Sequence, residues 1–305
     1  MTQVGFVGLG IMGAPMAVNL VRAGFTVVGY DPVPRGPEQL VAAGGRAGTS
    51  IAQAVATADV VVTMLPDSPQ VEQVALGPGG VLEHARPGTL VVDMSSIAPD
   101  VARTVSAAAR ARGLRPLDAP VSGGEAGAIE GSLSIMVGGE PADFTAARPV
   151  LDAVGATVVH VGGDGAGQTV KVANQLVVAG VIELVAEAIV LLEACDVDVK
   201  AALDVLAGGL AGNKVLDRKR ASMLARDFRP GFRVDLHHKD LGNMLATARR
   251  AGVPLPLGAL VAELMAALRA RGGGSLDHSA LLLLVEELAG RGPGLAGEHP
   301  GGSAS

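Results

Sequence analysis

Apolar residues form two alternating patterns along the first half of the chain. Short runs rich in β-branched residues are separated by alanine-rich stretches with helical spacing. The runs lie at 4–7, 26–30, 59–65, 89–93 and 157–161, and the helical stretches at 14–22, 51–57 and 100–112. Continuous apolar strands that alternate with helices are typical of a parallel sheet covered on both faces. The pattern therefore predicts a doubly wound α/β domain over residues 1–162.

The pattern changes at GGDGAGQ, residues 162–168. Beyond this segment the strand signal almost disappears and helical spacing takes over. We expect helices at 168–195, 198–207, 213–225, 235–251, 256–271 and 278–290. These predict an all-α helical C-terminal domain over residues 163–291, which a long interdomain helix joins to the α/β domain. Residues 292–305 are rich in Gly, Pro and Ser and have little to bury, so we expect a disordered tail.

Composition narrows the possible partners of the chain. Its 305 residues suffice for two domains, and apolar residues make up 49% of them but aromatic residues only 2%. Few aromatic residues and a net charge of −6 argue against a nucleic-acid partner, which requires stacking side chains or a basic surface. Cys195 is the one cysteine of the sequence, so it cannot form an internal disulfide. A reducing, cytoplasmic location is therefore expected.

Two segments raise the question of a membrane. The stretch 172–195 is strongly apolar, but two amide and three glutamate side chains interrupt it, so we interpret it as a buried helix. The N-terminal MTQVGFVGLG has no basic region and leads directly into a glycine motif. We therefore expect neither a signal peptide nor a membrane partner.

A glycine motif follows the first expected strand and opens the first expected helix. A dinucleotide site of the Rossmann type needs glycine for a tight turn, for close approach of a pyrophosphate, and for close packing of helix and strand. The phosphate charge then meets the exposed N–H groups of the helix start. We predict such a site here, with an ordinary glycine turn as the alternative. The residues expected at the cofactor are Gly8, Gly10, Ile11, Met12 and Gly13.

Asp31 ends the second expected strand. Its carboxylate is expected to accept hydrogen bonds from the adenosine ribose and to repel a 2′-phosphate, which favours NAD(H). Arg35 follows four residues later and is placed to receive that phosphate, so NADP(H) is the alternative. A simple turn residue before Pro32 is a further interpretation of Asp31.

Other residues follow strands at the edge where doubly wound domains bind ligands. Leu65, Pro66 and Ser96 are therefore expected to flank the cofactor, unless they only mark strand ends. In DAPVSGG, residues 118–124, the segment Ser122-Gly123-Gly124 brings a hydroxyl beside unhindered N–H groups. Such a group can hold a carboxylate, although the segment alone is equally consistent with a turn.

Lys171 and Asn174 share one face of the long expected helix, because three residues separate them. A lysine near the positive end of the helix dipole loses its proton more easily, which suits an acid/base group. The surrounding sequence is apolar, so a solvated surface lysine is the weaker interpretation of Lys171. Lys239, in the polar run 237–240, either closes over the cofactor or belongs to a solvated helix face. The histidines of that run lack partners at metal-ligand spacing, so no metal site is expected.

Four motifs together resemble the β-hydroxyacid dehydrogenase family. They are GFVGLGIMGAPMAVNL at 5–20, DAPVSGG at 118–124, GAGQTVKVANQ at 165–175 and KDLGNM at 239–244. They occur in the order of the family and cover nearly the whole chain to about residue 290. Narrower segments, among them SGGEAGAIEGSLSIMVGG at 122–139 and PGFRVDLHHKDL at 230–241, resemble its tartronate semialdehyde (2-hydroxy-3-oxopropionate) reductase branch.

The resemblance implies a role for several residues. Lys171 is the implied catalytic acid/base, and Asn174 helps to position it and the substrate. Ser122, Gly123 and Gly124 are implied to hold the substrate carboxylate. Lys239 is implied to contact the cofactor. Family members form dimers or tetramers through the helical domain, so self-association is also expected.

The implied reaction is hydride transfer from NAD(P)H to the aldehyde of 2-hydroxy-3-oxopropionate, which gives glycerate. The alternative enzymes are 3-hydroxyisobutyrate dehydrogenase and other short-chain β-hydroxyacid dehydrogenases. Imine reductases share the architecture but carry another residue in place of Lys171, which argues against that class. A nucleotide-sensing module without catalysis is the alternative outside enzymes.

Overall fold

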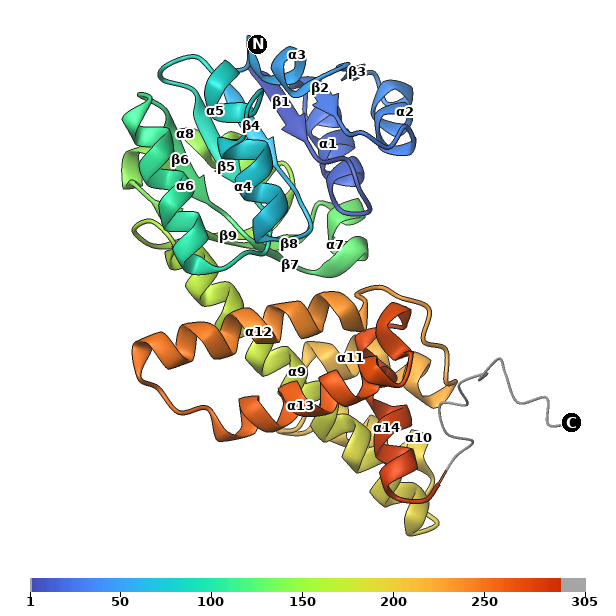
Figure 1. The fold of residues 1–305 in the computed structure, drawn as a ribbon. Helices are drawn as coiled ribbons and strands as arrows, with labels where there is room; N and C mark the ends of the chain where they lie inside the picture. The colour runs from blue at the N-terminus through green and yellow to red at the C-terminus, as the bar shows by residue number, and fades with distance from the viewer. Residues whose placement is uncertain (1, 292–305) are drawn as a thin grey trace, which may run out of the picture. The chain divides into compact units, whose positions relative to one another are not determined.

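The computed structural model describes residues 2–291, which form two compact units that divide between Val172 and Ala173. The first unit is a sheet with helices, and the second is helical (Figure 1). This confirms the predicted α/β fold followed by an all-helical region. The tail expected at 292–305 lies outside the described residues.

A nine-stranded sheet forms the centre of the first unit as far as the structure describes it. Its strands are β1 (Gln3–Val7), β2 (Thr26–Tyr30), β3 (Arg46–Ala47), β4 (Val60–Thr63), β5 (Leu90–Asp93), β6 (Arg115–Asp118), β7 (Val121–Ser122), β8 (Leu133–Gly139) and β9 (Gly155–Gly162). Their order is β3-β2-β1-β4-β5-β6-β8-β7, and β9 pairs with β8. Since β1 lies between β2 and β4, the winding direction reverses there, and doubly wound sheets bind ligands at this point.

One end of the sheet departs from the predicted parallel arrangement. The strands from β3 to β6 are parallel, but β8 runs antiparallel to both β6 and β7. Arg115 and Pro116 interrupt the apolar pattern of β6, and β8 ends in two glycines, so neither strand has a strong sequence signal. After Ser122 and the helix that follows it, β8 returns the chain beside β6.

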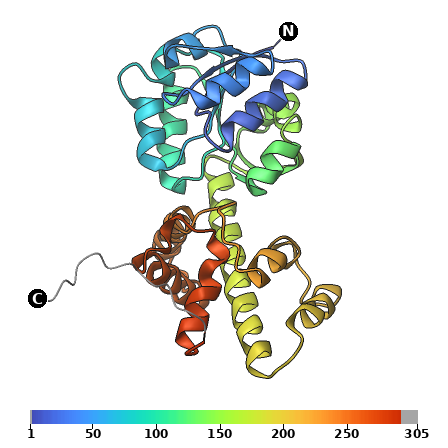
Figure 2. The same cartoon turned by 90° about the vertical axis from the view of Figure 1, so that its right-hand side faces the viewer.

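Helices cover both faces of the sheet, as Figure 2 shows from the side. They are α1 (Gly13–Arg22), α2 (Arg35–Ala42), α3 (Ile51–Val55), α4 (Ser68–Leu76), α5 (Val81–His84), α6 (Pro99–Ala111), α7 (Gly124–Glu130) and α8 (Pro141–Asp152). On one face Phe6 belongs to a core with Leu20 of α1 and Leu151 of α8. On the other face Val61 packs in a core with Leu82 of α5. Because strand side chains alternate between faces, both faces of the central strands are buried.

The long helix α9 (Ala166–Ala194) begins in the first unit and continues through the second. The remaining helices are α10 (Val199–Gly208), α11 (Lys214–Leu224), α12 (Val234–Ala251), α13 (Pro256–Ala270) and α14 (Leu281–Leu288), with 3-10 turns η1 (Gly273–Ser275) and η2 (His278–Ala280). The units divide between Val172 and Ala173 because the first turns of α9 bond to the sheet. By length and composition alone α9 could span a membrane, and half of its most apolar window is buried in the protein.

Glu183 is a buried acid near the middle of α9. It is 5% exposed, and its Oε2 atom has no hydrogen-bond partner among the described residues. Burial, and then the charge of Glu187 one turn later, raises the pKa of Glu183 to about 7. The carboxyl therefore binds its proton more tightly in the folded chain than in the unfolded chain.

We expect Glu183→Gln to stabilise the protein at pH 8 more than at pH 5. The folded pKa lies above the unfolded value of 4.5, so the stabilisation by this proton is complete below about pH 4.5 and is lost as the pH rises to about 7. The expected gain at pH 8 is about 1–3 kcal/mol in the free energy of unfolding, measured with urea. Glu263→Gln, at an exposed position of α13, is the control and should change little. Equal gains for Glu183→Gln at both pH values would contradict this account.

Candidate active site

The glycine loop between β1 and α1 is held by contacts that exclude side chains. Gly8 has a φ of +96°, and its N–H donates to the Tyr30 carbonyl at 2.9 Å. A Cβ atom on Gly13 would lie 1.9 Å from the Gly8 carbonyl oxygen. A Cβ on Gly10 would meet no atom within 4 Å, and Ile11 is 61% exposed. The loop is thus closed towards the protein and open at Gly10, which fits close approach of a pyrophosphate.

Asp31 joins the end of β2 to this loop. Its Oδ2 accepts a hydrogen bond from the Leu9 N–H at 2.7 Å, and its Oδ1 accepts one from the Val33 N–H at 2.8 Å. Asp31 therefore closes the local turn at Val33 and also bonds to the glycine loop at Leu9. Met12 precedes α1 without a side-chain cap, so the first N–H groups of α1 suit an anionic group. A carboxylate oxygen has room for a further donor, such as a ribose hydroxyl.

The carboxyl ends of β4 and β5 are bound together next to the glycine loop. Ser95 Oγ donates to Asp93 Oδ1 at 2.6 Å and accepts from the Leu65 N–H at 2.9 Å. Thr63 Oγ1 donates to the same Asp93 oxygen at 2.7 Å. Leu65 and Ser96 are partly exposed and Pro66 is exposed. All three residues lie beyond the strand ends, at the ligand-binding edge of the sheet.

Lys171 lies in the first turns of α9 and is 7% exposed. Its Nζ donates a hydrogen bond to the Val121 carbonyl at 2.7 Å. Ser122 follows Val121 directly, and Gly123 and Gly124 have φ values of +142° and +64° at the start of α7. The structure therefore brings the predicted acid/base amine next to the predicted carboxylate-binding segment.

Asn174 and Lys239 lie in the second unit and belong to one series of polar contacts. Asn174 Nδ2 donates to Gln175 Oε1 at 2.8 Å, and Gln175 Nε2 donates to Asp240 Oδ2 at 2.6 Å. Lys239 Nζ lies 3.0 Å from Asp240 Oδ1. Asp240 thus orients the side-chain amide of Gln175, which bonds to Asn174. Asp240 also pairs with Lys239.

The two histidines before Lys239 have different surroundings. His237 is fully buried, and its Nε2 lies 3.3 Å from the Gln175 carbonyl, which can only accept a hydrogen bond. Its Nδ1 lies 2.9 Å from His278 Nδ1. In the neutral ring His237 therefore carries its proton on Nε2, and His278 donates from Nδ1.

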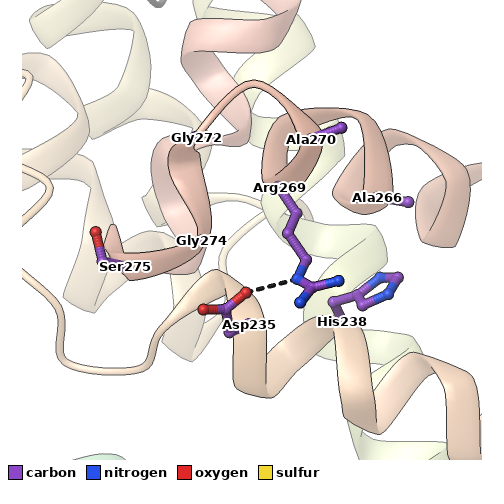
Figure 3. A pocket seen from close by; sticks show the side chains of 8 residues that line it. All are labelled: Asp235, His238, Ala266, Arg269, Ala270, Gly272, Gly274 and Ser275. Atoms are coloured by element: carbon purple, nitrogen blue, oxygen red, sulfur yellow. Dashed lines mark hydrogen bonds and ion pairs between the residues drawn. The ribbon is translucent and has the colours of Figure 1, made fainter. Parts of the chain in front are cut away.

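His238 faces a cavity of about 420 Å³ in the second unit. Its lining residues are Asp235, His238, Ala266, Arg269, Ala270, Gly272, Gly274 and Ser275 (Figure 3). Arg269 Nε pairs with Asp235 Oδ1 at 2.7 Å inside this cavity. None of the residues predicted to bind cofactor or substrate lines it. Within residues 2–291 no group of three His, Cys, Asp or Glu side chains is arranged to hold a metal ion.

Two buried residues near Lys171 received no role from the sequence. Asp118, 2% exposed, ends β6, and Gln168, fully buried, lies in the first turn of α9. Burial, together with the charge of Asp93, raises the pKa of Asp118 to about 6, although backbone hydrogen bonds, chiefly those from Gln168 and Gly165, oppose the shift. No strand was predicted at 115–118, so the sequence carried no signal for Asp118. The backbone groups that these two side chains meet become visible only in the fold.

Comparisons with known proteins agree with this arrangement. The family model described as the NAD binding domain of 6-phosphogluconate dehydrogenase matches residues 3–162. The model described as NAD-binding of NADP-dependent 3-hydroxyisobutyrate dehydrogenase matches residues 165–285.

Individual relatives match the chain over almost its full length. 2-Hydroxy-3-oxopropionate reductase of Escherichia coli K12 is 42% identical over 289 residues, 94% of this chain and 98% of its own. NAD-dependent L-serine dehydrogenase of Pseudomonas aeruginosa is 41% identical over 298 residues, 95% of this chain and 100% of its own. The structure of Mycobacterium tuberculosis 3-hydroxyisobutyrate dehydrogenase with L-serine has a TM-score of 0.86 at 39% identity and covers 93% of this chain and 99% of its own. The chain therefore belongs to the 3-hydroxyisobutyrate dehydrogenase-like family of NAD(P)-binding β-hydroxyacid dehydrogenases.

Proposed function

We propose that this oxidoreductase reduces the aldehyde of 2-hydroxy-3-oxopropionate to glycerate, with Lys171 as the proton donor. The observation that supports this proposal most directly is the position of the Lys171 side chain. Its Nζ lies 2.7 Å from the carbonyl of Val121, the residue before Ser122. A short carboxylate substrate held at Ser122-Gly123-Gly124 has its carbonyl within reach of that amine. The similarity to a 2-hydroxy-3-oxopropionate reductase supports this choice of substrate.

Each residue then has a specific task. When bound, the reduced nicotinamide supplies the hydride. The Lys171 ammonium donates a hydrogen bond to the substrate carbonyl oxygen, and gives up its proton as negative charge develops there. The Ser122 hydroxyl and the N–H groups of Gly123 and Gly124 bind the carboxylate and fix the other end of the substrate. Asn174, on the same face of α9, orients the substrate, and in the reverse reaction neutral Lys171 accepts the proton.

We propose NAD(H) as the preferred cofactor. The Asp31 carboxylate lies at the end of β2, where it accepts ribose hydroxyls and repels a 2′-phosphate. Arg35 is exposed at the start of α2, so NADP(H) is the alternative. We also propose that Lys239 contacts the bound cofactor, as its motif in the family implies.

We propose that the enzyme works in the cytoplasm as a homo-oligomer, without a nucleic-acid or membrane partner. Val177, Leu184 and Leu191 lie seven residues apart on α9 and are 63%, 54% and 63% exposed. A seven-residue spacing keeps apolar side chains on one helix face, as in helices that pair with another helix. This face supports self-association through the helical unit.

A substrate and cofactor panel tests the proposed reaction. We expect the highest kcat/KM for reduction of 2-hydroxy-3-oxopropionate with NADH. Oxidation of 3-hydroxyisobutyrate and of L-serine, each with NAD and NADP, are the comparison reactions. A higher kcat/KM for either of these oxidations would instead assign the chain a 3-hydroxyisobutyrate dehydrogenase or an L-serine dehydrogenase activity. If none of these substrates changes the absorbance of the nicotinamide band, the result would support a nucleotide-sensing module without catalysis.

Removal of the Lys171 amine tests the mechanism. We expect Lys171→Met to lower kcat by about 10²–10³, since a preorganised donor contributes that much to rate. Its dissociation constant for NADH, measured by fluorescence, should stay within about threefold of wild type. Lys200→Met, at an exposed lysine, is the matched control and should retain full activity. Full turnover by Lys171→Met would exclude Lys171 from the chemistry.

A charge on the exposed face of α9 tests self-association. We expect Leu184→Glu to shift the protein towards monomer in sedimentation velocity, because an interface buries its apolar centre. Val41→Glu, at a half-exposed apolar position on α2, is the control and should leave the oligomer intact. A wild-type protein that sediments as a monomer at micromolar concentration would refute the proposal.

A further inference from the structure

We infer that Asp118 and Gln168 are a positioning pair that sets the location of the Lys171 amine. Together they fix the first turn of α9 against the ends of β5 and β6. This inference rests on the proposed function, because it assigns Lys171 the proton transfer. It adds two residues that touch neither substrate nor cofactor in the proposed mechanism.

Asp118 supplies a cap to α9 from a neighbouring strand. Its Oδ1 accepts the Gly165 N–H at 2.7 Å, and its Oδ2 accepts the Gln168 N–H at 2.9 Å. The Gln168 N–H is one of the first N–H groups of the helix, which have no partner within it, and Gly165 directly precedes the helix. A carboxylate that accepts both N–H groups fixes the helix start. The cap comes from β6, and α9 is thereby fixed to the sheet.

Gln168 connects the same turn to the loop after β5. Its Nε2 donates to the Ser95 carbonyl at 2.7 Å, and its Oε1 accepts the Ile97 N–H at 3.1 Å. These two backbone groups flank Ser96, which is expected to lie at the cofactor. One amide therefore ties the helix that carries Lys171 to the loop of Ser96.

The packing around the cap leaves no room for a side chain at two glycines. A Cβ on Gly167 would lie 2.4 Å from the Met136 carbonyl oxygen and 2.6 Å from that of Asp118. A Cβ on Gly138 would lie 2.4 Å from Asp118 Oδ1. The start of α9 therefore rests directly on the backbone of β8 and on the end of β6.

Lys171 follows Gln168 by three residues on one side of α9, and its amine bonds to Val121 of the segment that starts at Asp118. The segment 118–121 thus contacts the helix at both of its ends, through a carboxylate and through a carbonyl. A shift of the first turn moves the amine relative to Ser122. Misplacement of a catalytic group by about 1 Å costs on the order of 100-fold in rate.

The test uses the full chain with Asp118→Asn, Gln168→Glu and Lys171→Met. Asparagine presents an NH₂ group to one of the two N–H donors, and glutamate cannot donate to the Ser95 carbonyl. We expect Asp118→Asn to lower kcat by about 10–100-fold while KM and the NADH dissociation constant stay within about threefold. We expect Gln168→Glu to lower kcat similarly and also to weaken NADH binding. Asp164→Asn, which breaks the nearby Arg110 ion pair but removes no cap, is the matched control and should keep wild-type kcat.

A double variant separates positioning from simple loss of stability. If Asp118 acts through Lys171, Asp118→Asn in the Lys171→Met background should cause no further loss of kcat. All rates are compared well below the melting temperature of each variant. Gln168→Glu with its own double variant decides the question if Asp118→Asn does not fold. Additive losses, or wild-type kcat in both single variants, would overturn the inference.

The pH profile gives a second readout. The pKa of Asp118 is raised to about 6 by burial, so the wild-type kcat should fall as the pH drops below about 6 and one cap bond is lost. The charge of Asp93 on β5 acts on Asp118, the Lys171 amine of α9 bonds to Val121 three residues later, and Arg103 on α6 packs against Gly165. Asp118→Asn should lack this acid limb. Persistence of the limb in Asp118→Asn would contradict the inference.

If Lys171→Met keeps full turnover, the proposed function fails regardless of the other variants. If Lys171→Met is inactive while Asp118→Asn and Gln168→Glu retain wild-type kcat, only the positioning inference fails.

Discussion

The hydrogen bond from the Lys171 amine to the Val121 carbonyl is the interaction on which the proposed chemistry depends. Lys171 is 7% exposed, and burial of a charged residue is tolerated only where hydrogen-bond acceptors replace the water around its amine. An ammonium can donate three hydrogen bonds, and the Val121 carbonyl accepts one of them. The location of that carbonyl is fixed in turn by the pairing of Val121 with Ile135 in β8. The sheet therefore decides where the amine of α9 lies.

The antiparallel strand β8 makes this arrangement possible. A parallel continuation after β6 would require a long crossover, which would carry the chain away from the strand end. Instead, β7 begins three residues after Asp118 and pairs with β8 in the same antiparallel register as β6, so the segment 118–122 runs along β8. Gly138 and Gly167 then let α9 approach the same strand closely. The irregular end of the sheet is thus where the predicted acid/base residue and the predicted carboxylate-binding segment meet.

The pattern of apolar and polar residues predicted those strands and helices whose side chains repeat with a regular period. The expected strands at 4–7 and 26–30 and the helices from 198 to 271 agree with the structure to within about two residues. The strands β6 and β8 had no such pattern, because Arg115-Pro116 and paired glycines interrupt it. The polar run 237–240 could be interpreted as a solvated face, whereas His237 is buried against His278, 41 residues later in the chain. Contacts of this kind depend on tertiary packing, which local spacing does not encode.

The same reasoning explains why Lys171 and the glycine loop had a sequence signal while Gln168 had none. Backbone geometry requires glycine at Gly8 and Gly13, and Gly10 leaves room for a pyrophosphate. All three lie within six residues, so their spacing carries the information. Lys171 is a charged residue in an apolar helix, which by itself requires a partner. Gln168 is a neutral amide whose partners, Ser95 and Ile97, lie more than 70 residues earlier in the chain. Its importance follows from two backbone groups that become its partners only in the folded chain.

The division of tasks within the site explains how one scaffold serves relatives with different substrates. The proposed contacts of Lys171 and of Ser122-Gly123-Gly124 recognise a carbonyl or hydroxyl oxygen and a carboxylate, which all short β-hydroxy acids possess. Discrimination must come from side chains that face the remaining substituent, a hydroxyl, a methyl or an ammonium group. A site that hydrogen-bonds a hydroxyl rejects an analogue without it by about 10⁴–10⁵, whereas an apolar pocket discriminates about 10–200-fold per methylene. A change of one or two such side chains can therefore replace the substrate while the cap of α9, the amine and the cofactor loop remain the same.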